Sequence, residues 1–468
     1  MNKRPTALPY QREGVRMIEQ FGGKALLFDE QGLGKTVQAL WTIRRNQAYW
    51  PAIVVCPAIV KINWQREAAY HVGMRAAVCS GRRPPRPGVQ LTETHHIYVI
   101  NYDILDNWFE WLYMLGAGSI WFDESQNLGN RETGWTQAAK ELSRHIPHRV
   151  AMSGTPFMNY PRELWPTLNI VRPDLFPSFP QYAVEYCAPK KQPWGWTYNG
   201  ATNLEGLNTL LREHMMVRRL KVEVARDLPP KTRSVQVVPL TNREEYEHAE
   251  GDFLGWLGGV DIARAERAAR AEAVTRVTYL RQLAARGKVA AIKEWLKNWQ
   301  ATTNEKLVVF TYHRKLMEVL IKHFGKVAVH IDGTVTGEAR QAAVDQFQRD
   351  KKSIFCFIQI RSGGVGITLT SASSALFCEL DSVPGRHSQA EDRIHRIGQT
   401  KNVFIYYLIA EGTVDEDLAE VVQGKQGNFD QVFDGSNNGS LNILNLLVEK
   451  IQTRSRSRAT TKKKRVQK

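Results

Sequence analysis

The chain has 468 residues, a length that suits two or three domains of ordinary size. Hydrophobic residues make up 43% of it, which is enough to bury real cores and excludes an intrinsically disordered chain. The formal net charge is +16 at pH 7, from 63 Lys and Arg against 47 Asp and Glu. A surplus of that size favours a polyanionic partner, although solubility alone would also explain it.

No segment of the sequence predicts export or membrane insertion. Residues 1–15 lack the apolar run of a signal peptide, and no apolar stretch approaches the ~20 residues of a membrane span. The five cysteines are scattered and form no C-x-x-C pair, so we expect buried, reduced thiols rather than disulfides or zinc ligands. The sequence predicts an intracellular protein, in the cytoplasm of a bacterium or phage-infected cell or in a nucleus.

Short apolar runs alternate with helical patterns in two parts of the chain. They are residues 25–28, 52–56, 97–100, 119–122 and 149–153, and then residues 307–310, 327–331, 353–360, 374–380 and 403–409. Each run is brief and is followed by polar residues, Gly or Pro, which is typical of strands buried in a parallel sheet with crossover helices. The sequence therefore predicts an α/β fold with two parallel-sheet domains in tandem.

The composition between and after these parts predicts the domain limits. We expect a first domain over 1–170, an aromatic, basic and then helical insertion over 171–285, and a second domain over 286–425. A helical extension would follow over 426–453, and a basic tail over 454–468. The tail holds eight Lys and Arg and no acid, a composition typical of a disordered nucleic-acid tether, a nuclear signal or a solvated terminus.

The segment ALLFDEQGLGKTVQAL (25–40) predicts a phosphate-binding loop. An apolar strand leads into a loop with Gly32 and Gly34, whose backbone can wrap closely around phosphate, and a helix follows. Lys35 is expected to reach the β- and γ-phosphates, and Thr36 to ligate Mg²⁺. The match to G-x-x-x-x-G-K-[ST] is incomplete, because Asp29 stands where the first Gly would be.

A carboxylate pair ends a second strand, in SIWFDESQ (119–126). Asp123 is positioned to hold the Mg²⁺ shell, and Glu124 to activate the water that attacks the γ-phosphate. A solvated Asp-Glu pair after a strand is common, but a phosphate loop upstream in the same α/β domain makes that interpretation weaker.

Weaker signals lie on either side of this site. Gln11 precedes the first strand and could pair with the edge of an adenine. The segment MSGTP (152–156) ends another strand, and the hydroxyls of Ser153 and Thr155 either sense the Glu124 cluster or cap a turn.

The second domain offers two arginines. In QAEDRIHRIGQ (389–399), Arg393 and Arg396 are three residues apart on an expected helix, so they point the same way. An arginine supplied by a second domain would stabilise charge on a transferring phosphoryl group. An ordinary basic helix face is the alternative. The preceding SGGVGITLTSAS (362–373) suits close approach to phosphates of a nucleotide or of a nucleic acid.

Taken in order, these segments resemble the Swi/Snf-type ATPases of helicase superfamily two, with two RecA-like domains. The matching strings are DEQGLGKT, DESQ, MSGTP and QAEDRIHRIGQ, supported by VVCPAIVKINWQREA, VVFTYHRKLMEVL and HIDGTVTGEARQAAVDQFQ. The resemblance covers roughly residues 5–420. A finer likeness, to the annealing-helicase branch that rewinds strands and remodels forks, lies in residues 186–233, which include PWGW and the M-x-RRLK-x-x-V run.

The resemblance implies roles for matching residues. Adenine would be contacted by Gln11, and phosphates and Mg²⁺ would be held by the loop, that is by Gly32, Leu33, Gly34, Lys35 and Thr36, with Asp123 and Glu124 coordinating and catalysing. Ser153, Thr155 and Thr368 would couple hydrolysis to nucleic acid, and the second domain would add Gly366, Gln389, Arg393 and Arg396, the last as arginine finger. Gln31 replaces the usual Met, and Gln126 the commoner His.

The sequence therefore predicts an ATP- and Mg²⁺-dependent translocase on duplex or forked DNA, working as a monomer. A strand-separating DNA or RNA helicase is an alternative that would have the same fold but would unwind strands. A basic nucleic-acid-binding protein with an inactive nucleotide site is a second alternative. The sequence argues against it, because an inactive site usually lacks one of the motif residues, which are all present here: Lys35, Thr36, Asp123, Glu124 and Arg396. A translocating subunit of a restriction or defence complex is a further alternative, and no partner-binding module in the sequence supports it.

Overall fold

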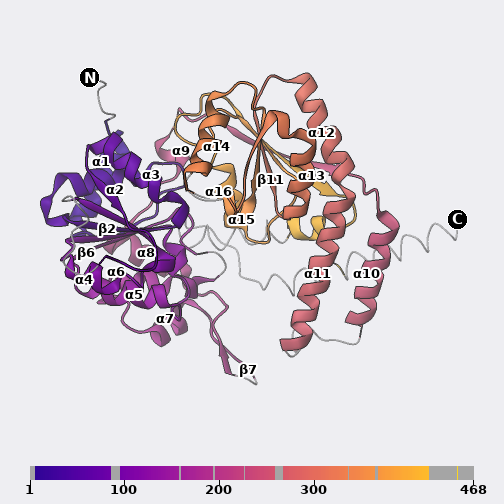
Figure 1. The fold of residues 1–468 in the computed structure, drawn as a ribbon. Helices are drawn as coiled ribbons and strands as arrows, with labels where there is room; N and C mark the ends of the chain where they lie inside the picture. The colour runs from indigo at the N-terminus through magenta and orange to yellow at the C-terminus, as the bar shows by residue number, and fades with distance from the viewer. Residues whose placement is uncertain are drawn as a thin grey trace.

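The computed structural model describes residues 6–85, 95–157, 160–192, 195–225, 227–258, 267–335, 337–363, 367–420 and 451. It has two lobes, each built on a parallel sheet (Figure 1). Gly366, the tail over 454–468 and nearly all of the expected extension over 426–453 lie outside the described residues.

The first sheet has seven strands in the order β3-β4-β2-β5-β6-β1-β9, and every pairing in it is parallel. The strands are β1 (Lys24–Leu27), β2 (Ala52–Cys56), β3 (Ala76–Val78), β4 (Ile97–Asn101), β5 (Ser119–Asp123), β6 (His148–Met152) and β9 (Met216–Val217). Their near-continuous burial explains why they read as unbroken apolar runs, since helices cover both faces.

The second sheet has six strands in the order β10-β15-β14-β11-β13-β12, again with every pairing parallel. The strands are β10 (Lys231–Val238), β11 (Leu307–Thr311), β12 (Ala328–Ile331), β13 (Phe355–Gln359), β14 (Ser374–Phe377) and β15 (Val403–Ala410). The ten predicted runs coincide with ten of the strands in the two large sheets, which confirms two tandem parallel-sheet domains.

Helices complete both lobes. In the first lobe they are α1 (Pro9–Gln20), α2 (Lys35–Arg45), α3 (Lys61–Glu67), α4 (Phe109–Met114), α5 (Gly134–Arg144), α6 (Trp165–Val171), α7 (Phe179–Tyr186) and α8 (Leu204–His214). After α9 (Lys221–Val224) come α10 (Arg243–Leu257), α11 (Arg267–Gly287), α12 (Val289–Thr302), α13 (Arg314–Phe324), α14 (Gly337–Arg349), α15 (Ile360–Gly363) and α16 (Pro384–Glu391). Helices α10 and α11 confirm that the later part of the expected insertion is helical where the structure describes it.

Apolar clusters place these helices on the sheets. Helices α1, α2 and α3 pack on one face of the first sheet, and α4, α5 and α6 on the other. In the second lobe, α12 and α13 cover one face and α14 and α16 the opposite one. All five cysteines are free and buried in these cores, as the sequence predicted.

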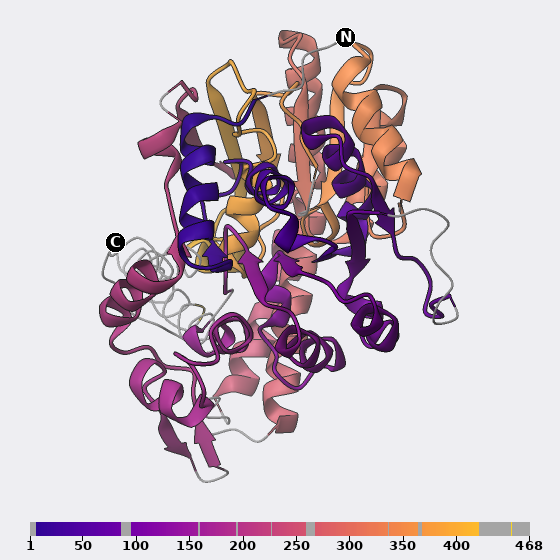
Figure 2. The same cartoon turned by 90° about the vertical axis from the view of Figure 1, so that its left-hand side faces the viewer.

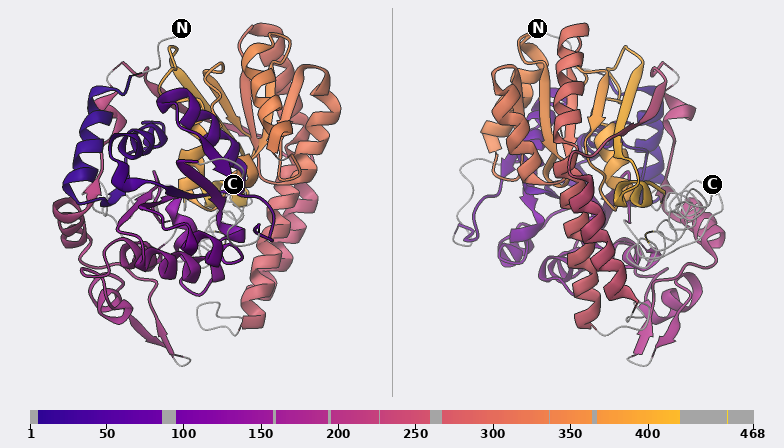
Figure 3. Two further views of the ribbon diagram at one scale, coloured as in Figure 1. Left: turned by 60° about the vertical axis from the view of Figure 1, so that its left-hand side comes forward. Right: turned by 90° about the vertical axis from the view of Figure 1, so that its right-hand side faces the viewer.

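The stretch between the two predicted domains takes part in both sheets. Strand β9 hydrogen-bonds to β1 in the first sheet, and β10 pairs with β15 over eight residues in the second. The domain limits expected at residues 171 and 285 stay a prediction. The pairing shows that residues 216–217 belong to the first sheet and residues 231–238 to the second. A small hairpin, β7 (Lys190–Gln192) and β8 (Gly195–Thr197), projects from the first lobe (Figures 2 and 3).

Among the described residues, no helix is both long enough and apolar enough to cross a membrane.

A buried lysine at the turn between α11 and α12 links these helices to β15 and to the segments that follow β14 and β15. The side chain of Lys288 is fully buried, and its Nζ donates to the carbonyls of Cys378 (2.7 Å) and Leu408 (3.0 Å) and to Oδ2 of Asp415 (2.5 Å). Three acceptors match the three N–H donors of an ammonium, so the charge is fully satisfied.

Replacing Lys288 with Met should therefore lower the free energy of unfolding of this lobe by about 3–5 kcal/mol, because the change leaves Asp415 buried and unpaired. A urea titration followed by circular dichroism measures it. The exposed Lys297 of α12 offers a matched control, since Lys297→Met should change the value by less than about 0.5 kcal/mol. Equal effects of the two substitutions would contradict this account.

Candidate active site

The loop after β1 has the backbone that a phosphate-binding loop requires. Gly32 and Gly34 adopt left-handed conformations, with φ of +86° and +73°, which a side chain would disfavour. Gly34 caps the N-terminus of α2, so that the first helical N–H groups point into the loop. A Cβ on Gly32 would lie 2.8 Å from Cβ of Arg396, so this glycine also permits the closest approach of the second lobe.

Within the described residues, the hydrogen bonds of the lysine in this loop go to backbone carbonyls. Nζ of Lys35 donates to the carbonyl of Asp29 at 2.9 Å and reaches that of Glu30 at 3.5 Å. Burial lowers the pKa of Lys35, and the charges of Glu124, Asp29 and Asp123 oppose that shift. An ammonium held by neutral carbonyls beside an open cavity is placed to receive an anion.

The carboxylate pair lies at the carboxyl end of β5. The side chain of Asp123 accepts a hydrogen bond from Nε1 of the buried Trp64 at 2.9 Å, and its carbonyl accepts one from the hydroxyl of Tyr102 at 2.9 Å. Burial, and then the neighbouring charge of Glu124, raises the pKa of Asp123 to about 7. Glu124 has a positive φ of 52°, which is unusual for a residue with a side chain.

A continuous line of hydrogen bonds runs from this pair to the second lobe. Nε2 of Gln126 donates to Oε2 of Glu124 (2.8 Å), and its Oε1 accepts from the hydroxyl of Ser153 (2.7 Å). The Ser153 oxygen in turn accepts from the backbone N–H of Thr155 (2.9 Å), whose hydroxyl accepts from Nε2 of Gln389 (2.7 Å). Gln389 belongs to α16, so the line crosses between the lobes.

The two arginines of the second lobe lie beside this site, Arg393 buried and Arg396 partly buried. Within the described part of the chain, Nε and Nη2 of Arg393 have no hydrogen-bond partner. Burial lowers the pKa of Arg393 to about 10, against the attraction of Glu124. Burial likewise lowers the pKa of Arg396, whose Nη1 makes a long contact of 3.4 Å with the carbonyl of Ile367. A buried guanidinium with unused donors, such as that of Arg393, suits an anionic ligand.

A cavity of about 360 Å³ separates the lobes at this point. Its walls include Gln11, Gly32, Gly34, Lys35, Thr36, Asp123 and Glu124 from the first lobe, and Thr368, Asp392, Arg393 and Arg396 from the second. It lies beyond the carboxyl ends of β1 and β5, where open α/β sheets bind ligands. The glycine loop and the unpartnered Arg393 donors fit the polyphosphate of a nucleotide.

Two of the predicted nucleotide-binding residues, Leu33 and Gln389, are not in the described cavity wall. Leu33 is fully buried, and it presents its carbonyl to the hydroxyl of Tyr10 (2.9 Å) and to Nε2 of Gln11 (3.2 Å). Gln389 bonds to Thr155 and is not part of the cavity wall. Gly366 lies outside the described residues.

Sequence reasoning assigned no role to the arginines that hold the loop in place. The carboxylate of Asp29 is fully buried and accepts three bonds from Arg219, from N (3.0 Å), Nε (3.0 Å) and Nη2 (2.6 Å), and one from Nε2 of Gln38 (2.8 Å). Arg218 donates to the carbonyl of Phe28 at 2.7 Å. In the sequence, the RRLK run (218–221) contains both arginines and could have indicated this role. It also explains the missing first glycine, since an Asp there anchors the loop.

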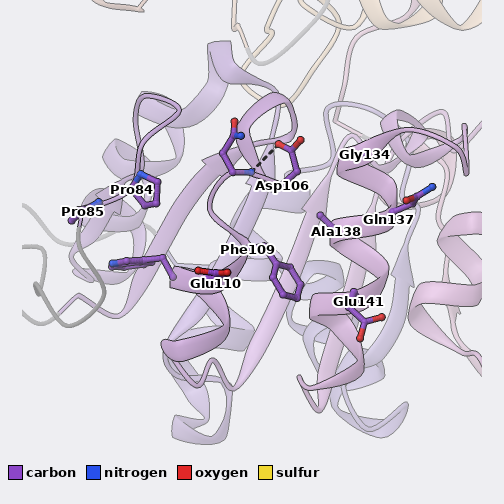
Figure 4. A pocket seen from close by; sticks show the side chains of 11 residues that line it. Pro84, Pro85, Asp106, Phe109, Glu110, Gly134, Gln137, Ala138 and Glu141 are labelled. Atoms are coloured by element: carbon purple, nitrogen blue, oxygen red, sulfur yellow. Dashed lines mark hydrogen bonds between the residues drawn. The ribbon is translucent and has the colours of Figure 1, made fainter.

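A second hollow, of about 970 Å³, lies on the first lobe (Figure 4). The described residues of its lining include the carboxylates of Asp106, Glu110 and Glu141 beside Phe109, and no Lys or Arg. A polyphosphate would be repelled there, so the interdomain cavity is the better nucleotide site although it is the smaller of the two.

Comparison with protein families agrees with this geometry. Residues 10–284 match the SNF2-related domain, and residues 287–398 match the helicase conserved C-terminal domain. The chain belongs to the SNF2-related family. The resemblance predicted from the motifs is thereby confirmed, and membership implies that the chain binds ATP.

The curated relatives are longer proteins. A SWI/SNF-related matrix-associated actin-dependent regulator of chromatin subfamily A-like protein 1 from Xenopus laevis is 33% identical over 425 residues, covering 89% of this chain and 43% of that protein. The Caenorhabditis elegans homolog is 33% identical, covering 91% and 61%. The human DNA annealing helicase and endonuclease ZRANB3 is 29% identical, covering 88% and 39%. The chain thus spans between 39% and 61% of the length of these three relatives.

Among solved structures, the Sulfolobus solfataricus SWI2/SNF2 ATPase core in complex with dsDNA is 22% identical, covers 93% of this chain and 94% of that one, and has a TM-score of 0.43.

The anchoring of the phosphate loop gives a testable consequence. Asp29→Ala should lower the free energy of unfolding by about 3–5 kcal/mol, because Arg219, with 11% of its side chain exposed, would lose its buried partner. Glu13 is a matched control on the same arginine, at 3.9 Å and 64% exposed, so Glu13→Ala should cost less than about 1 kcal/mol. Urea unfolding of both variants measures the difference, and equal losses would refute the anchoring role.

Proposed function

We propose that this chain hydrolyses ATP in the interdomain cavity and uses the resulting opening and closing of the lobes to move along duplex DNA. The observation that carries the proposal is the meeting of cations from both lobes at one cavity. Lys35 comes from the first lobe and the unpartnered Arg393 from the second, with Asp123 and Glu124 between them. Charge of opposite sign must enter for both cations to be satisfied.

The residues suit phosphoryl transfer to water. Backbone N–H groups of the glycine loop and the ammonium of Lys35 would hold the phosphates, and Glu124 would take the proton of the attacking water. Arg396, with Arg393, would neutralise charge that develops on the transferred group. Mg²⁺, held by Thr36, Asp123 and phosphate oxygens, would supply further charge neutralisation when bound. Among the described residues no group of three His, Cys, Asp or Glu could hold a metal unaided, which fits an ion that arrives with the nucleotide.

The hydrogen-bonded line through Gln126 supports coupling of hydrolysis to movement. It joins the carboxylate of Glu124 to Gln389 in the second lobe through short contacts of 2.7–2.9 Å. A change at Glu124 as the γ-phosphate leaves would therefore alter contacts that hold the lobes together. These contacts support the proposed coupling role of Ser153 and Thr155.

Duplex or forked DNA is the proposed track. The net charge of +16 favours a phosphate backbone, and the human relative carries the name DNA annealing helicase. A strand-separating helicase remains the alternative with the same chemistry. Loss of the nucleotide site is less favoured, since the residues that would hold and cleave ATP lie together around one cavity.

The first experiment measures ATP hydrolysis without nucleic acid and with single-stranded DNA, duplex DNA, forked DNA or RNA. Duplex or forked DNA should stimulate the most, and Glu124→Gln should abolish turnover while ATP still binds, because an amide cannot take the proton from water. Stimulation mainly by single strands or RNA would favour the unwinding helicase. Absence of turnover under every condition would overturn the proposal.

The arginine assignment has a separate test. Arg396→Ala should reduce kcat by about 10³–10⁵-fold, since the variant loses a transition-state contact. DNA affinity, measured by fluorescence anisotropy, should stay within about threefold of the wild-type value. Arg349, exposed at the end of α14, is a control whose change to Ala should leave kcat unaltered. Normal hydrolysis by Arg396→Ala would refute the finger role.

A further inference from the structure

Lys221 contacts both lobes beside the candidate site but is not part of the described cavity wall. Lys221 begins α9, in the segment that links the two sheets, and its side chain is buried with 6% exposed. Its Nζ donates to Oδ1 of Asp392 (2.5 Å) and to the carbonyl of His395 (2.8 Å), both in the second lobe. Toward the first lobe, Nζ lies 3.7 Å from Oε1 of Glu30, and the backbone N–H of Lys221 donates to Oε2 of Glu30 (2.7 Å).

These partners stand next to the residues that handle phosphate. Glu30 lies in the phosphate loop, two positions before Gly32, and Asp392 directly precedes Arg393. A Cβ on Gly32 would lie 3.3 Å from Cε of Lys221 and 2.8 Å from Cβ of Arg396. Loop, lysine and arginine segment therefore meet at one point, where α9 and α16 lie between the lobes (Figure 1).

The linking segment is fastened on both sides of this point. Before it, Arg219 holds Asp29 at 2.6 Å in the first lobe. After it, Lys231 and Arg233 hold Glu391 of α16 at 2.7 and 2.6 Å in the second. Each of those ion pairs joins the linking segment to one lobe alone. Lys221 differs because its ammonium is shared between Glu30 and Asp392.

A shared buried charge makes the two lobes interdependent. An ammonium removed from water needs most of its donors paired, and unpairing one partner of a buried ion pair costs several kcal/mol. Separation of the lobes would leave Lys221 with partners on one side only. The position of Arg393 and Arg396 relative to the phosphate loop is thereby tied to the linking segment.

We propose that Lys221 is a positioning residue, an interdomain latch that sets Arg393 and Arg396 against the phosphate loop when the lobes close. The inference rests on the proposed function and deepens it, since it assigns the alignment of the arginines to a residue that does not line the nucleotide cavity. Because Lys221 lies in the linking segment, closure of the site would also pull on the chain between the lobes.

The test compares Lys221→Met with the wild type in steady-state hydrolysis and in ATP binding. We expect kcat to fall by about 10–100-fold, because misplacement of catalytic groups by about 1 Å costs about that much. The Kd for ATP, measured with a fluorescent analogue, should change less than about threefold, because the phosphate loop itself is intact. Lys221→Arg should restore much of kcat, since a guanidinium can bridge the same two carboxylates.

Two further variants separate a latch from a general structural role. Lys231, at the start of β10, pairs with Glu391 (2.7 Å) and lies 3.9 Å from Asp392, both in the second lobe. Because no ion pair described for Lys231 reaches the first lobe, the kcat of Lys231→Met should stay within about threefold of wild type. In a double-mutant cycle, Lys221→Met and Asp392→Asn should be strongly non-additive, because each removes the same contact. Additive effects, or a kcat of Lys221→Met equal to the wild-type value, would overturn the latch.

Small-angle scattering separates failure of the latch from failure of the proposed function. An ATP analogue should reduce the radius of gyration of the wild type but not that of Lys221→Met. Wild-type protein that compacts without hydrolysing ATP would refute the proposed function and leave the latch supported. Equal compaction of both proteins would refute the latch, whatever the rate of hydrolysis.

Discussion

The candidate site depends on cations from both lobes that face one cavity and that the described protein groups do not fully satisfy. Among the described residues, the buried Arg393 has two donor atoms without a partner, and Lys35 donates to backbone carbonyls. Removing such charges from water is costly, and like charges facing one cavity repel each other. In the proposed function a polyphosphate removes both penalties at once. Nucleotide binding and closure of the lobes would then be a single equilibrium, because the closed state gains most from the anion.

Other buried charges of the chain show how different this site is. Although burial alone would raise it, the charge of Lys231 and the hydrogen bond from Arg233 hold the pKa of Glu391 at about 2. Asp29 accepts four hydrogen bonds, and Lys288 has three acceptors. In contrast to these paired charges, Arg393 keeps two buried donor atoms without a hydrogen-bond partner among the described residues, beside the candidate catalytic carboxylates. Incomplete pairing is thus evidence for ligand binding here, where burial alone would not be.

The sequence predicted what depends on neighbours along the chain and missed what depends on distant ones. Buried parallel strands are short apolar runs, so ten of them were recognisable, and the phosphate loop is a local pattern of strand, glycines and helix. Strand β9 has two residues, and β10 alternates exposed and partly buried positions, so neither reads as a buried run. The partners of Arg219 and Lys221 lie about 170–190 residues away, and no local pattern specifies such pairs.

The side chain at position 126 determines whether the hydrogen-bonded line between the lobes responds to a change of geometry or of protonation. Gln126 donates to Glu124 through its amide nitrogen and accepts from Ser153 through its oxygen, so its two ends are chemically distinct. A histidine, which the family commonly has here, could change charge near neutral pH, whereas an amide cannot. From Gln126 to Gln389 every link is therefore a neutral group. The line can transmit a change of position at Glu124 to the second lobe, but no proton, so coupling through it should respond to geometry and not to the protonation of its members.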